Sequence, residues 1–170
     1  SGAYKSLLET IAENGGKISL PVYTTKSGRT LLGGGKIMPD YPVRIDTNTI
    51  LFTTIAKKGL FLEYGFKYAL ENKSLINSNY NGSFSEFLNN FRIDTLELEK
   101  FGKFVHSRGL WNEAMWCQDK PAIATFLKAV VAQYYWDTEG FVAVRAMDEE
   151  VVRKAVEIMP LSKELFNKNK

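Results

Sequence analysis

Apolar and polar residues alternate in several parts of the first half of the chain. The clearest case is the pair of runs Ile50–Ile55 and Leu60–Tyr68, which flank the turn-forming segment Ala56–Gly59. A period of two is typical of half-buried strands, so this pattern predicts an antiparallel hairpin with one strongly apolar face. A second hairpin is predicted over 18–32 around Lys26–Arg29, and the apolar run Phe141–Val144 predicts a short further strand.

The second half of the chain instead repeats its apolar residues every three or four positions, the period of an amphipathic helix. Ser83 (or Ser85), Asp94 and Asp119 stand where N-caps are expected, and Pro160 would end the last helix. The polar segment from Asn72 to Ser85 is predicted to be a loop. These signals predict helices over 84–91, 95–106, 120–136 and 148–159, in addition to a short helix over 4–14.

Together the two patterns predict a single α+β domain over residues 1–170. A mostly antiparallel sheet from residues 18–70 and 141–144 would be covered by the helices of the C-terminal half. The β-rich, basic region would span 15–70 and the α-rich region 83–166. The chain begins Ser1-Gly2 without a methionine, so we expect a tag remnant or a fragment of a longer protein.

Composition narrows the function by exclusion. With 45% hydrophobic and 24% charged residues, the chain is not a disordered or low-complexity protein. One cysteine excludes an intramolecular disulfide framework, and one histidine excludes a metal centre that needs two imidazoles from the same chain. No stretch approaches about 20 consecutive apolar residues, so we expect a soluble protein with no membrane partner. The single cysteine permits a reducing compartment, which favours the cytoplasm but leaves the localisation open.

Charge is distributed unevenly along the chain. Residues 1–80 carry ten basic and six acidic side chains, whereas residues 81–170 carry twelve and thirteen. Basic hairpins with interleaved aromatic residues suit single-stranded nucleic acid, because bases stack on the rings and phosphates pair with the cations. This favours a non-enzymatic binding or accessory module that contacts nucleic acid, through Lys26, Arg29, Lys36, Arg44, Lys57, Lys58, Tyr64 and Lys67.

Carboxylates and a lysine suggest an enzymatic alternative. Asp40 (or Asp46) is followed by Glu71 and Lys73 in a Glu-x-Lys arrangement, and this order resembles the PD-(D/E)xK nuclease pattern. The resemblance implies a divalent-metal nuclease of the kind found in toxins, phages or mobile elements, with Mg²⁺ held by Asp40 and Glu71. A third alternative is a structural or assembly protein that meets a protein partner through its apolar surface.

Two further sets of residues are weaker candidates, one for a catalytic pair and one for a phosphate-binding loop. His106 and Cys117 are eleven residues apart, and a thiolate–imidazole pair would need both side chains to converge. We expect instead that Cys117 is a buried apolar residue and that His106 lies near a helix end. Gly33–Lys36 lacks the remaining residues of a phosphate-binding loop and is interpreted as a flexible connector.

Overall fold

The structure, a computed structural model, describes residues 22–24, 30–32, 43, 47–80 and 82–167. The chain divides into two compact units, Arg44–Ile158 and residues 1–43 together with 159–170. In the second of these, β1 (Val22–Thr24) pairs antiparallel with β2 (Thr30–Leu32), and Val22 lies opposite Leu32. The hairpin expected over 18–32 is therefore present at its described residues.

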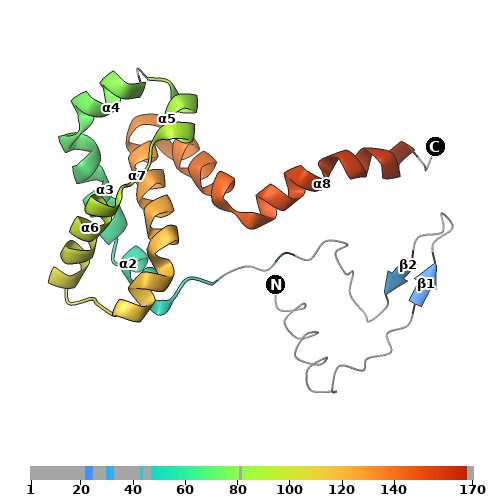
Figure 1. Ribbon diagram of the computed structural model, residues 1–170, viewed down its shortest axis with the longest axis horizontal. Helices are drawn as coiled ribbons and strands as arrows, with labels where there is room; N and C mark the ends of the chain where they lie inside the picture. Colours follow the sequence, from blue (N-terminus) through green and yellow to red (C-terminus); the bar gives the residue numbers. More distant parts are fainter. Residues whose placement is uncertain (1–21, 25–29, 33–42, 44–46, 81, 168–170) are drawn as a thin grey trace. The chain divides into compact units, whose positions relative to one another are not determined.

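Helices make up the larger unit. They are α2 (Ile50–Lys57), α3 (Leu60–Glu71), α4 (Lys73–Tyr80), α5 (Phe84–Asn90), α6 (Thr95–Ser107) and α7 (Glu113–Asp148), followed by α8 (Glu150–Asn167), which continues past the unit's end at Ile158 (Figure 1). Apart from residue 81, which the structure does not describe, the chain from 47 to 167 contains no strand. The predicted α+β fold with a mostly antiparallel sheet is wrong, because this unit is all-helical.

The error begins in residues 50–70, where α2 and α3 replace the expected hairpin. The buried residues of α2 are Leu51, Phe52 and Ile55, and those of α3 include Phe61, Gly65 and Ala69. Their spacing of three to four positions is helical. The alternation was misleading because it counted Leu62 and Phe66 as inward-facing, whereas both are exposed.

Two other segments also differ from the prediction. The expected loop 72–85 contains α4, and the expected strand Phe141–Val144 lies inside α7. The helices expected over 84–91 and 95–106 are confirmed as α5 and α6. Their caps are confirmed as well, since Ser83 Oγ accepts from the Glu86 N–H at 3.3 Å and Asp94 Oδ1 from the Glu97 N–H at 2.8 Å.

The start predicted for the long helix is wrong. α7 begins at Glu113, where Asn112 Oδ1 accepts from the Met115 N–H at 3.0 Å. Asp119 is buried within this helix and serves another one: it accepts from the N–H of Thr49 at 3.1 Å and from the Thr49 hydroxyl, and Thr49 in turn caps α2. Asp119 thus joins the start of α2 to α7. The last helix also differs, because α8 continues through Pro160.

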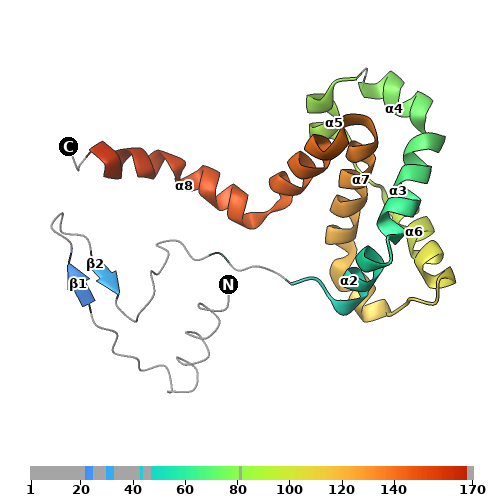
Figure 2. The same ribbon diagram turned by 180° about the vertical axis from the view of Figure 1, so that it is seen from behind.

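α7 consists of two helices that fold back on each other (Figure 2). Helical geometry breaks at Trp136 (φ −131°, ψ 26°) and Asp137 (φ 51°, ψ −154°). The rings of Phe126 and Phe141 are 5.4 Å apart, although fifteen residues of straight helix would span about 22 Å. Gly140 makes the tight turn possible, because a Cβ there would lie 2.8 Å from the Ala132 carbonyl oxygen.

The larger unit has a core of its own. One cluster of buried residues joins α2, α3, α6 and α7, with Phe61 and Phe101 stacked at 5.3 Å between ring centroids. A second joins α3, α4, α5 and both halves of α7, with Phe87 and Phe91 stacked at 4.5 Å. At Gly65 a Cβ would lie 2.5 Å from Val130 Cγ1, so α3 and α7 approach closely there. Among the residues of α8 whose side chains the structure describes, 150–161, none belongs to either cluster.

Candidate functional site

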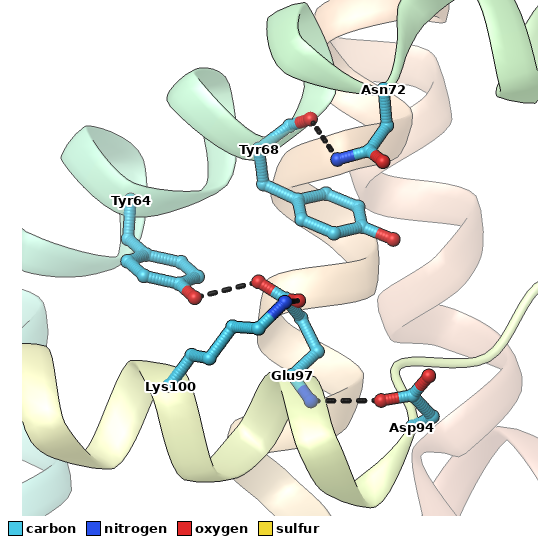
Figure 3. Close-up of polar contacts among 6 residues, drawn as sticks. All are labelled: Tyr64, Tyr68, Asn72, Asp94, Glu97 and Lys100. Atoms are coloured by element: carbon cyan, nitrogen blue, oxygen red, sulfur yellow. Dashed lines mark hydrogen bonds and ion pairs between the residues drawn. The ribbon is translucent and has the colours of Figure 1, made fainter.

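A carboxylate lies between α3 and α6 in a network of polar side chains (Figure 3). Glu97 is nearly buried; its Oε1 accepts from the Tyr64 hydroxyl at 2.6 Å and its Oε2 from Lys100 Nζ at 2.9 Å. Asp94, the cap of α6, holds the backbone of the same residue. Tyr68 and Asn72 flank this network on α3, where the Asn72 amide donates to the Tyr68 carbonyl at 2.9 Å.

The electrostatics of this network keep its donors protonated. Burial, followed by the hydrogen bond to Glu97, raises the pKa of Tyr64. The hydrogen bond to Glu97 likewise raises the pKa of Lys100. Both Glu97 oxygens thus have donors, and the hollow beside them has no room for a water molecule. The network holds α3 against α6 and offers no space for a substrate.

Lys128 on α7 is another residue whose pKa differs from its ordinary value. Its half-buried ammonium donates to the Leu88 carbonyl oxygen at 2.6 Å and lies 5.9 Å from the centroid of the Phe87 ring. Burial, assisted by the charge of Arg92, lowers the pKa of Lys128 to about 8. Because Leu88 is near the end of α5, this lysine satisfies a carbonyl that the helix leaves free.

The residues proposed for metal-dependent cleavage are only partly described. Glu71 ends α3 and forms an exposed ion pair with Lys67 at 3.8 Å, while Lys73 begins α4. Asp40 and Asp46 lie outside the described residues. Within the described part of the chain, no three or more His, Cys, Asp or Glu side chains are grouped so that they could hold a metal ion. Convergence of the four residues stays a prediction.

The residues proposed to contact nucleic acid have separate surroundings. Lys57, Lys58 and Lys67 are exposed, whereas Tyr64 is half-buried with its hydroxyl bound to Glu97. Lys26, Arg29, Lys36 and Arg44 lie outside the described residues. From residue 47 to 158 the chain carries thirteen basic and fourteen acidic side chains, so this part has no excess of positive charge.

His106 and Cys117 are not brought into contact by any interaction described here. His106 lies in the last turn of α6, as expected, with its ring 5.9 Å from that of Trp111. Cys117 is exposed on α7, with its Sγ 3.7 Å from Glu113 Oε1, so the expectation of a buried cysteine is wrong. Gly33–Lys36 lies outside the described residues.

The most distinctive surface of the described chain is apolar, and sequence reasoning missed it. On α8, the side chains of Val151, Val152 and Val156 are exposed, and Val156 retains 61% of its accessible surface. On α3, Leu62, Phe66 and Leu70 are exposed as well. We expected the apolar positions of 148–159 to face the core, and the pattern itself does not distinguish a core face from an exposed face.

Comparison with known proteins adds one match. A model of a family described as a family of unknown function (DUF8443) matches residues 51–137, from α2 to the turn within α7. No curated protein and no solved structure matches the chain. Among the described helices, none is sufficiently long and apolar to cross a bilayer.

Proposed function

The chain belongs to the DUF8443 family, a family of unknown function, and we propose that it is an assembly protein that joins protein chains through α8. The observation that carries this proposal is the exposed apolar face of α8. An amphipathic helix stabilises itself by burying its apolar face, and a contiguous exposed patch commonly marks an interaction site.

The charges of α8 favour a protein partner over a lipid surface. Helices that lie on membranes carry mainly lysine and arginine on the polar face. Between residues 149 and 158, α8 and its cap instead carry Glu149, Glu150 and Glu157 beside Arg153 and Lys154. Such a mixed polar face is typical of helices that bind in protein grooves.

Two valines at the centre of the apolar face provide the test. The double variant Val152→Ser/Val156→Ser should have a lower molar mass than the wild-type chain in light scattering. The protein concentrations should run from about 5 to about 200 µM, the range of transient protein association. In the wild-type chain, mass and amide protection of α8 should both rise with concentration. Val142→Ser, at another exposed apolar position, is the matched control and should assemble normally. A wild-type chain that remains monomeric, or assembly unaffected by the two valine changes, would refute the proposal.

Nucleic-acid binding is a second candidate, supported by the exposed lysines Lys57, Lys58 and Lys67. Lys57 at the end of α2, Lys58 in the turn after it and Lys67 on α3 would give binding that weakens steeply with salt. Lys57→Glu/Lys58→Glu should then reduce retention of single-stranded DNA or RNA at low salt.

A further inference from the structure

We propose that α8 of one copy packs antiparallel along α3 of a second copy of this chain. This inference rests on the proposed assembly function and specifies which surface receives the helix. It is drawn from two matching series of side chains on the exposed faces of α3 and α8.

The receiving surface is a ridge on α3. Leu62, Phe66 and Leu70 follow one another at intervals of four residues, so they lie along one side of the helix. Their exposed fractions are 42%, 38% and 60%. Tyr134 of α7 lies beside this ridge, with its ring 6.1 Å from that of Phe66 and its side chain exposed too. The ridge and Tyr134 together form an apolar surface across α3 and α7.

α8 presents a ridge with the same spacing. Val152 and Val156 are four residues apart and exposed, and Val151 adjoins them. An apolar ridge on one helix packs into the groove beside a ridge on another. The two surfaces are therefore similar in both width and chemistry.

Charged residues follow both ridges on the same side. In α3, each ridge residue immediately precedes a charge, giving the alternating series Glu63, Lys67 and Glu71. In α8, Val152 and Val156 are likewise each followed by a charge, Arg153 and then Glu157, positive and then negative. Because the charged row lies on the same side of both ridges, antiparallel packing brings the rows together, whereas parallel packing puts them on opposite sides of the contact.

A shift of one step pairs opposite charges along the rows. Lys67 then lies opposite Glu157, and Glu71 opposite Arg153. The other possible shift uses Glu63, which already forms an ion pair with Arg108. Lys67–Glu71 and Lys154–Glu157 are pairs within single helices, and Lys67, Glu71 and Glu157 are exposed. Such pairs contribute little stability, so exchanging them for contacts between copies costs little.

A second copy fits this arrangement because both surfaces belong to one chain. In a two-fold dimer each α8 meets the α3 of its partner, so the contact forms twice and the assembly closes. A single residue, Glu149, separates α7 from α8. Antiparallel helix pairs within one chain usually need loops of about two to five residues, so α8 does not fold back along α7.

Charge reversal tests the pairing directly. Sedimentation equilibrium of the full chain should show that Lys67→Glu or Glu157→Lys alone raises the dimer dissociation constant at least about tenfold, the effect expected of like charges in contact. The double variant Lys67→Glu/Glu157→Lys should return it to within about threefold of wild type. Lys103→Glu on α6 and Glu139→Lys on α7 make the same charge changes at exposed positions outside the two ridges and should leave the constant unchanged.

The alternative outcomes separate this inference from the assembly proposal. If the serine variants of Val152 and Val156 abolish assembly but charge reversal has no effect, assembly through α8 stands and the α3 surface is refuted. If the chain is monomeric and α8 is nevertheless protected from amide exchange, α8 docks within its own chain, and the proposal that it packs on a second copy is contradicted. Circular dichroism of each variant identifies any loss caused by misfolding.

Discussion

Lys128 connects the packing of single side chains to a measurable dependence of stability on pH. Its pKa is about 8 in the folded chain, against 10.5 for an ordinary lysine. Between these values the unfolded chain binds a proton that the folded chain lacks, so the contribution of Lys128 to folding stability rises with pH across this window and is lost as pH falls through 8. The cause is the cost of holding a half-buried ammonium beside Arg92.

We therefore expect the wild-type chain to gain stability relative to Lys128→Met as pH rises from about 7.5 to 9.5. The gain in the free energy of unfolding should be about 1 kcal/mol, reduced by solvent screening of a half-buried group. Urea denaturation at both pH values measures it. Lys128→Arg, which stays charged throughout, should show the same growing difference from wild type, and a constant difference would contradict the assignment.

At the scale of the elements, the sequence predicted helices well where a cap and a helical period agreed. α5 and α6 have both signals, in Ser83 and Asp94 and in the apolar residues that follow. The start of the long helix was predicted wrongly from Asp119, because an aspartate that caps its own helix and a buried aspartate that binds the start of α2 look the same in sequence. In α2 and α3, aromatic and β-branched residues favoured strands, and tertiary burial of Phe52 and Phe61 decided otherwise.

The break inside α7 coincides with the end expected for the long helix at residue 136, but the sequence did not indicate the backbone conformation of Asp137. Its φ of 51° and ψ of −154° lie in a region that glycine adopts readily and other residues adopt at a cost of about 1–3 kcal/mol. Asp137→Gly should therefore stabilise the chain by about 1 kcal/mol, after the greater chain entropy of glycine when unfolded is subtracted. Thermal or urea unfolding measures the change.

A matched change two residues later is the control. Glu139 is exposed and lies in the second helical half of α7, so Glu139→Gly should destabilise the chain by about 1 kcal/mol. If both glycine variants are destabilised equally, Asp137 is not strained and the turn is maintained by other contacts.

At the scale of the whole molecule, the sequence could not indicate which apolar helix faces are buried in the core. The pattern over 148–159 is as regular as that of α6, yet α6 supplies Leu98, Phe101 and Val105 to the core, whereas residues 150–159 of α8 supply none. The polar contacts of Glu97 were hidden for the same reason, because they join residues 33 positions apart. Both features depend on tertiary arrangement, which periodicity does not encode.

Truncation distinguishes the contribution of α8 to stability from that of the helical core. A chain ending at Glu149 lacks α8 but keeps both hydrophobic clusters, so its free energy of unfolding should stay within about 0.5 kcal/mol of the full chain. A chain ending at Gly140 also loses Val144 from the second cluster and Phe141 from its contact with Phe126, and should lose about 3 kcal/mol or more. Urea denaturation of the three chains measures both steps. Equal losses at the two end points would mean that α8 stabilises the unit by packing onto it, and the apolar face of α8 would then be a core face and not a surface for a second chain.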